Sequence, residues 1–304
     1  MNSQKLTGLI AATYTPLDSN EDLNTSAIGP MVDHLLASGV KGLYVCGSTG
    51  EGISLASNER KVVAHTFVEA THGRVPVIVQ VGHNSLTEAK QLAAHAKQIG
   101  ADAVSATCPS YFKVTDTATL TDCMAQIAGA APDLPFYYYH IPALTGSTVD
   151  VVEFLQQARE TIPNLVGIKY TDTKLHEFQQ CLELGDGLYD IVWGCDEMLL
   201  GAIATGARAA IGSTYNIAAP LYCQIIEALE QGDLAEAQRL QSRSVTMIQT
   251  LKQFPFHAAM KAVLAMNGLE VGGCRLPQGR LTDDDVVTLR NELQSIGYFD
   301  WCQG

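Results

Sequence analysis

Basic residues are scarce in this sequence: 19 lysines and arginines stand against 32 aspartates and glutamates, which gives a net charge of −13 over 304 residues. Nucleic-acid phosphates and anionic membrane surfaces both require clustered basic side chains, and the chain has no such cluster. Long apolar runs are also missing. No stretch approaches the length of a membrane span, and the weakly apolar residues 8–12 are too short for the core of a signal peptide. These absences argue against nucleic-acid and membrane partners.

Paired cysteines are missing as well. None of the eight cysteines belongs to a C-x-x-C pair or to a Cys/His array with zinc spacing. Scattered thiols in a chain of this length are typical of a reducing compartment, so we expect a cytoplasmic protein. Apolar residues, in contrast, make up 47% of the chain against 17% charged residues, as in a globular protein with a large core.

Short apolar runs recur along the chain, each followed by a segment with helical periodicity. The runs are near-continuous rather than alternating, which is typical of parallel strands covered on both faces. Between them, the spacing of Ser85 and Glu88 predicts a helix start, and Gly39 and Gly100 predict helix ends. Eight such units predict a (β/α)8 TIM barrel, with a doubly wound sheet as the alternative. The runs are residues 6–15, 40–47, 75–82, 101–109, 134–142, 165–171, 189–196 and 209–214.

The last third of the chain lacks strand-like runs. Residues 225–254 and 281–297 carry apolar residues at helical spacing instead. We therefore expect residues 1–218 to form the barrel that carries the active site. Residues 219–304 are expected to form a C-terminal helical extension packed on the barrel, within a single structural unit.

Active sites of such barrels lie at the carboxyl ends of the strands. The loop GSTGEG, residues 47–52, follows the second run there and offers backbone N–H groups to an anion. It lacks the Gly-Lys-Ser/Thr ending of a P-loop and is not G-x-G-x-x-G, so a nucleotide site is not indicated. An ordinary turn and a small-carboxylate site both remain open for this loop.

Lys169 stands at the end of the apolar run 165–171, and Tyr139 closes the preceding run. Removal of water from a lysine amine can free it to attack a carbonyl, and a neighbouring phenol can carry protons. The alternatives are a lysine that extends to solvent at the barrel rim and a tyrosine that only packs.

The histidines do not converge on a metal site. Asp196 and Glu197 form an acidic pair near a strand end without imidazole partners. A metal-dependent aldolase would need such partners, so recognition of a hydroxylated substrate is at least as well supported. We expect no metal and no other cofactor.

The motifs GSTGEG, YYYHIPALTG, GIKYTDT, GCDE and GSTYN occur in one order and spacing. In this the chain resembles the N-acetylneuraminate lyase / dihydrodipicolinate synthase family of Schiff-base aldolases, from about Leu6 through the C-terminal helices. YYYHIPALTG and IGSTYN are most like the lyase branch. Leu144 stands where synthases carry an arginine that grips a second carboxylate, and its apolar side chain argues against the synthase reaction.

The resemblance implies a pyruvate-releasing cleavage of N-acetylneuraminate. Lys169 would form an imine with the keto carbon, and Tyr139 would move a proton at the C4 hydroxyl. Ser48 and Thr49 would bind the substrate carboxylate. The sugar tail would be held by Thr171, Gly194, Asp196, Glu197, Gly212 and Ser213.

Tyr111 matches a family tyrosine that reaches into a neighbouring subunit's site, which implies a homotetramer. Phe112 stands where many members have a second tyrosine, and His140 replaces a common asparagine. Two other functions remain open. One is a related aldolase acting on a 2-keto-3-deoxy sugar acid, and the other is a non-catalytic member that binds a keto acid. Retention of both Lys169 and Tyr139 argues against the latter.

Overall fold

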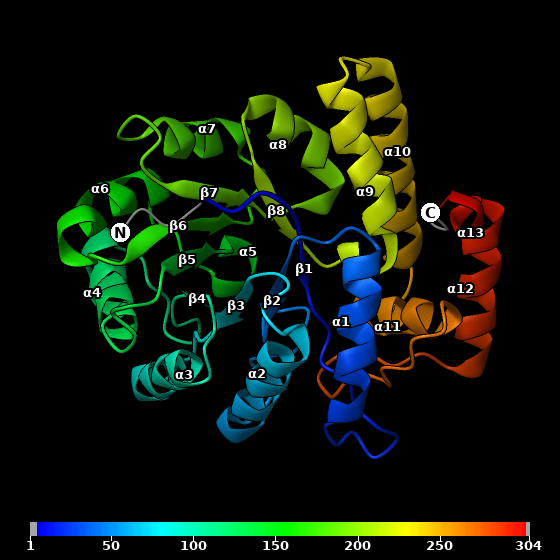
Figure 1. The fold of residues 1–304 in the computed structure, drawn as a ribbon, viewed down its shortest axis with the longest axis horizontal. Coiled ribbons are helices and arrows are strands. Elements are labelled where there is room, and N and C mark those ends of the chain that lie inside the picture. The colour runs from blue at the N-terminus through cyan, green and yellow to red at the C-terminus, as the bar shows by residue number, and fades with distance from the viewer. Residues whose placement is uncertain (1–4, 302–304) are drawn as a thin grey trace.

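The computed structural model describes residues 5–301, in which eight parallel strands close into a barrel (Figure 1). Each strand pairs with the next along the chain, and the last pairs with the first. The predicted TIM barrel is therefore confirmed, and each predicted run contains one strand. The strands are β1 Gly8–Ala12, β2 Gly42–Val45, β3 Val77–Gln80, β4 Ala103–Ala106, β5 Phe136–His140, β6 Leu165–Tyr170, β7 Asp190–Trp193 and β8 Ala209–Gly212.

Helices surround the barrel (Figure 1), and the helix signals predicted at Ser85, Gly39 and Gly100 are confirmed. The Ser85 hydroxyl accepts a hydrogen bond from the Glu88 N–H at the start of α3. Gly39 and Gly100 follow α1 and α3 with φ of +94° and +78°, the left-handed conformation that ends a helix. Two short 3-10 helices occur at Thr25–Ala27 and Asp196–Met198 (η1 and η2). The α-helices are α1 Ile28–Ala37, α2 Ser57–Thr71, α3 Leu86–Gln98, α4 Thr117–Ala128, α5 Pro142–Thr145, α6 Val151–Thr161, α7 Leu175–Glu183, α8 Leu199–Thr205, α9 Tyr215–Glu230, α10 Leu234–Leu251, α11 Phe256–Met266, α12 Asp283–Ser295 and α13 Tyr298–Trp301.

Both faces of the strands are buried, which explains why their sequences are continuously apolar. One set of side chains fills the barrel interior, where Tyr44 and Tyr139 pack with Ile10 and Val192. The opposite set packs against the helices in a larger core. Tyr137 in the interior does more than pack, because its hydroxyl donates to the Asp190 carboxylate at 2.8 Å.

The C-terminal helices α9 to α13 gather on one side of the barrel, next to α1 (Figure 1). The predicted boundary between residues 218 and 219 falls inside α9, beside Ala218, whose φ of −142° marks a kink. The division of the chain into two parts at that point stays a prediction. Within residues 5–301, no helix combines the length and apolarity needed to cross a membrane.

Candidate active site

Lys169 lies next to Tyr139 across the β5–β6 pair, where their Cα atoms are register partners. The Lys169 side chain does not extend to solvent, since only 4% of the residue is exposed. Its Nζ lies 4.0 Å from the centre of the Tyr139 ring and 4.1 Å from that of Tyr44. Within residues 5–301 no carboxylate forms an ion pair with this amine. A desolvated amine and a phenol thus stand together at the carboxyl end of the barrel, the end at which the active sites of such barrels lie.

Tyr44 completes the surroundings of the amine. Its ring meets that of Tyr139 edge-to-face at 5.7 Å, and its hydroxyl donates to the Ser105 hydroxyl at 3.0 Å. Burial raises the pKa of Tyr44 well above its usual value, and the neighbouring Tyr139 raises it further. Tyr44 therefore stays a neutral phenol at physiological pH. Neither the β2 pattern nor a motif indicated this residue, because its side chain fits an ordinary strand.

The GSTGEG loop is both a tight turn and a source of free donors. Its turn is closed by hydrogen bonds from the Glu51 N–H to the Ser48 carbonyl at 3.1 Å and from the Gly52 N–H to the Gly47 carbonyl at 3.0 Å. A Cβ at Gly52 would lie 1.9 Å from the Cys46 carbonyl oxygen, so only glycine fits. In the described part of the chain, the backbone N–H groups of Ser48 and Thr49 have no acceptor. The loop therefore presents two donors that a carboxylate can accept from.

Asp196 is buried at the start of η2 with one oxygen engaged and one free. Its Oδ2 accepts from the Thr214 N–H at 2.8 Å and from the Thr214 hydroxyl at 2.6 Å. Its Oδ1 has no partner among residues 5–301. Burial raises the pKa of this carboxyl to about 6, against the effect of the two Thr214 hydrogen bonds. Asp196 is thus an acceptor with spare capacity for a hydroxyl group.

Two of the predicted glycines make room for side-chain oxygens. A Cβ at Gly212 would lie 1.8 Å from Asp196 Oδ1, and a Cβ at Gly194 would lie 2.0 Å from the Thr171 hydroxyl oxygen. That hydroxyl is also buried without a partner within the described residues. The structure therefore brings Thr171 to Gly194 and Asp196 to Gly212, with an unsatisfied oxygen at each pair.

Glu197 and Ser213 make their contacts outside the pairs formed by Thr171 with Gly194 and by Asp196 with Gly212. Glu197 is partly exposed and pairs with Lys252 at the end of α10, with 3.2 Å between Oε1 and Nζ. Ser213 is half-buried, and its carbonyl accepts from the Asn216 side chain at 2.7 Å. The same amide also donates to the Ala12 carbonyl at 2.7 Å, which joins the end of β8 to the end of β1. Asn216 belongs to the GSTYN motif, but the sequence did not reveal this role.

Tyr111 lies on the surface, outside this buried group. It is 78% exposed, beside the 82% exposed Phe112, with 5.1 Å between the ring centres. The Asn84 side-chain oxygen accepts from the N–H groups of Ser110 at 2.8 Å and Tyr111 at 3.0 Å. Asn84 therefore shapes the loop that presents the two aromatic rings.

Comparison with known proteins adds to this geometry. The sequence profile of the Dihydrodipicolinate synthetase family matches residues 5–296. The chain belongs to this family. The resemblance drawn from the five motifs is therefore confirmed.

Several similar proteins are named N-acetylneuraminate lyase or sialic acid aldolase. The N-acetylneuraminate lyase of Xenopus tropicalis is 42% identical over 282 residues, which cover 90% of this chain and 91% of that protein. The solved structure of Proteus mirabilis N-acetylneuraminate lyase is 37% identical with a TM-score of 0.95 and covers 97% of this chain and 100% of its own. A catalytic lysine mutant of Ruminococcus gnavus sialic acid aldolase is 29% identical with a TM-score of 0.91 and covers 97% and 96% of the two chains.

A cavity of about 210 Å³ adjoins the GSTGEG loop of this family member. Its lining includes Ser48, Gln80, Thr107 and Leu144, and Leu144 is 62% exposed at its edge. The side chain at the position of the synthase arginine is thus an apolar one beside the cavity. It offers no bidentate donor to a second carboxylate.

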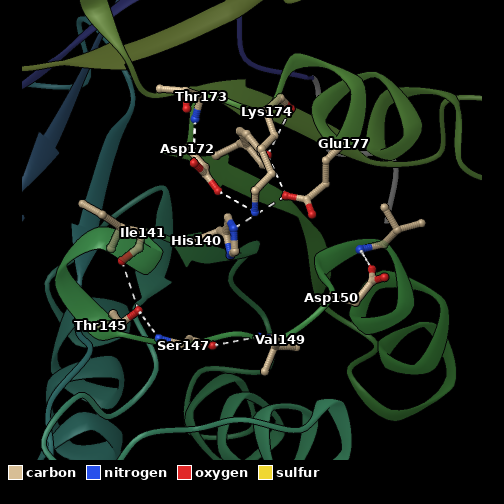
Figure 2. Close-up of polar contacts among 12 residues, drawn as sticks. His140, Ile141, Thr145, Ser147, Val149, Asp150, Asp172, Thr173, Lys174 and Glu177 are labelled. Carbon is tan, nitrogen blue, oxygen red and sulfur yellow. Dashed lines mark hydrogen bonds and ion pairs between the residues drawn. The ribbon is translucent and has the colours of Figure 1, made fainter.

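A polar cluster gathers around His140, the residue after Tyr139 in the sequence (Figure 2). His140 follows Tyr139 on β5, and its ring points toward Asp172, Lys174 and Glu177 (Figure 2). Lys174 Nζ lies 3.1 Å from Asp172 Oδ2, and the His140 Nε2 lies 3.9 Å from Glu177 Oε1. Burial lowers the pKa of His140 from its usual 6.5 to about 4; Asp172 acts in the opposite direction, and Lys174 adds to the lowering. The imidazole is therefore neutral at physiological pH.

The same cluster has donor atoms of the kind that bind metals. Ligand atoms of His140, Asp172 and Glu177 lie within 4.8 Å of one another. The Lys174 ammonium already supplies positive charge beside Asp172, and the Tyr170 hydroxyl donates to Glu177 at 2.6 Å. The histidine pattern did not reveal this group, because its carboxylates come from the loop and helix that follow β6.

Proposed function

We propose that this chain is a Schiff-base aldolase that reversibly cleaves N-acetylneuraminate to pyruvate and N-acetylmannosamine. The observation that carries the proposal is the buried Lys169 amine beside the Tyr139 ring. The lyase names of relatives that align over nearly the whole chain support the substrate.

The reaction follows from these two groups. The Lys169 amine adds to the C2 keto carbon and, with loss of water, forms a protonated imine. Tyr139 takes up the proton of the C4 hydroxyl as its own phenolic proton passes to the substrate carboxylate, and the electron pair of the C3–C4 bond moves toward the imine nitrogen. The C4 carbon of the substrate becomes the C1 aldehyde carbon of N-acetylmannosamine, and an enamine of pyruvate stays on Lys169. Protonation of the enamine at C3 and hydrolysis of the imine release pyruvate and restore the amine.

Substrate binding is assigned to the groups with unused hydrogen-bonding capacity. The free N–H groups of Ser48 and Thr49, with the Thr49 hydroxyl, bind the substrate carboxylate. The free oxygens of Thr171 and Asp196 accept hydrogen bonds from sugar hydroxyls. The remaining predicted binding residues, assigned on the resemblance, are Gly194, Glu197, Gly212 and Ser213.

The assembly is proposed as a homotetramer in which Tyr111 reaches a neighbouring active site. The exposure of two adjacent aromatic rings supports this, because large exposed aromatic surface is typical of an interface. Native mass spectrometry tests the stoichiometry. A cytoplasmic setting is supported by free thiols at all seven cysteines within residues 5–301.

Trapping with borohydride tests the chemistry. Reduction in the presence of pyruvate should inactivate the enzyme and add one reduced pyruvate adduct to Lys169, as read by peptide mass spectrometry. Lys169→Ala should show no adduct, whereas Lys97→Met, on exposed α3, should be labelled like the wild type. An adduct that persists in Lys169→Ala overturns the mechanism. Cleavage assays with N-acetylneuraminate beside a panel of 2-keto-3-deoxy sugar acids test the substrate, and activity on the panel alone would refute the lyase function.

A further inference from the structure

Lys261 on α11 joins three segments that lie far apart in the sequence. Its Nζ donates to the Thr15 carbonyl at 2.9 Å, to Glu51 Oε1 at 3.0 Å and to the Gly273 carbonyl. Only about 1% of either the Lys261 or the Glu51 side chain is exposed. One buried ammonium thus ties the end of β1, the GSTGEG loop and the C-terminal segment together.

Glu51 is held on both sides of its carboxylate and through its backbone. Its Oε2 accepts from the Arg275 N–H at 2.9 Å, and its φ of +56° is left-handed, which is unusual for a residue with a side chain. Its own N–H closes the turn onto the Ser48 carbonyl. A strained backbone persists only where its surroundings hold it in place. The loop conformation that exposes the Ser48 and Thr49 N–H groups therefore depends on this anchoring.

The ion pair also changes the electrostatics of the loop. The Glu51 carboxylate lies in the same turn as the two free N–H groups and, alone, would repel an anionic ligand. The Lys261 ammonium in contact with it cancels this charge in a region that water does not reach. A neutral pair leaves the N–H groups free to attract a carboxylate.

We propose that the Lys261–Glu51 ion pair is a positioning device that shapes and neutralises the GSTGEG loop for the carboxylate of a 2-keto acid. The proposal rests on the function proposed above. Lys261 and Glu51 act through the loop and do not touch the reacting atoms. The pair therefore governs capture of the carboxylate and leaves the chemistry at Lys169 unchanged.

The experiment compares two carbonyl ligands that differ only in the carboxylate. Borohydride trapping is titrated with pyruvate and with methyl pyruvate, whose ester carries no charge. The variants are Lys261→Met, Glu51→Gln and the double variant E51Q/K261M. Lys97→Met, which breaks the exposed ion pair between Lys97 and Asp133, is the control. Steady-state cleavage of N-acetylneuraminate gives KM and kcat for each.

Lys261→Met should raise the half-saturating concentration of pyruvate about tenfold or more, because the unpaired Glu51 carboxylate then repels the ligand carboxylate. The half-saturating concentration of methyl pyruvate should change less than about twofold. KM for N-acetylneuraminate should rise with the value for pyruvate, and kcat should change little. E51Q/K261M should lie between Lys261→Met and the wild type, because it leaves no unpaired buried charge.

If the ion pair contributed only to stability, Lys261→Met would raise the half-saturating concentrations of both ligands equally, and that result overturns the proposal. Unchanged pyruvate capture in Lys261→Met overturns it as well. If Lys261→Met does not fold, the double variant decides by the same comparison of the two ligands. Failure of the Schiff-base chemistry is a different result, because the wild type would then trap neither ligand, and failure of the substrate assignment would appear as cleavage of the 2-keto-3-deoxy sugar acids alone.

Discussion

Replacement of His140 by asparagine should change how the stability of the protein depends on pH. His140 is 3% exposed, and burial holds its pKa at about 4, against 6.5 in the unfolded chain. As the pH falls from 6.5 toward 4, the unfolded chain takes up a proton that the folded protein resists. The stabilising contribution is therefore fully present above pH 6.5 and is lost as the pH falls toward 4.

The size of the effect follows from the two pKa values. One pKa unit corresponds to about 1.4 kcal/mol, so the folded protein loses about 2 kcal/mol from this group between pH 7 and pH 5, and about 3 kcal/mol by pH 4. Asparagine does not titrate. The difference in unfolding free energy between the wild type and His140→Asn should therefore shift by about 2 kcal/mol over the first interval, toward the variant.

Urea unfolding followed by tryptophan fluorescence measures this shift, since Trp193 packs in the same core as Tyr170. Both pH values are compared at one protein concentration, so that assembly affects them alike. His176 lies exposed on α7 next to Glu177, and His176→Asn is the matched control, expected to follow the wild type. Parallel pH profiles for His140→Asn and the wild type would refute the assignment of His140 as a buried neutral imidazole.

Three further predictions concern other parts of the site. The pKa of Asp196 is raised to about 6, so the stabilising effect of its carboxyl is present below pH 4 and is lost as the pH rises through 6. Between pH 4 and 7, the unfolding free energy of D196N should therefore gain up to about 3 kcal/mol over that of the wild type, as measured by urea unfolding. No gain would contradict a buried carboxyl. Gly52→Ala places a Cβ 1.9 Å from the Cys46 carbonyl oxygen and should lower the free energy of unfolding by about 3 kcal/mol. Gly29→Ala, which has open space around it in α1, should raise the free energy of unfolding by about 0.5–1 kcal/mol. Equal urea midpoints for the two variants would be inconsistent with these contacts. Tyr111→Ser should abolish lyase activity while circular dichroism stays unchanged, and a fully active variant argues against its place in a neighbouring site.

The barrel could be predicted well because the evidence for each strand lies within a few consecutive residues. Strands covered on both faces must be apolar throughout, and each run reports this independently of the others. Tyr139 and Lys169 stand at the ends of neighbouring runs, so the two side chains could be expected next to each other, and the β5–β6 register confirms this. Loop conformation was partly accessible, since a Gly-rich segment at a strand end indicates a turn and exposed N–H groups.

Contacts between distant segments could not be read in the same way. Glu51 and Lys261 are 210 residues apart, and each looks like an ordinary charged residue in its own segment. The approach of Glu177 to His140 depends on how α7 packs next to the end of β6, where the Tyr170 hydroxyl donates to Glu177. Glu197 and Asp196 are adjacent in sequence, but one is buried and the other pairs with Lys252. Such differences arise only when barrel closure decides which side chains lose contact with water.

The anchoring of the GSTGEG loop by Lys261 has a consequence for protein synthesis. Residues up to and including Lys169, which contain both reacting side chains, leave the ribosome well before α11 does. Until Lys261 and Arg275 emerge, the Glu51 carboxylate has no partner on either oxygen. A nascent chain can thus hold every reacting group and still lack a finished carboxylate site. Completion of the carboxylate site therefore waits for residues 261–275 and not for the appearance of the catalytic residues.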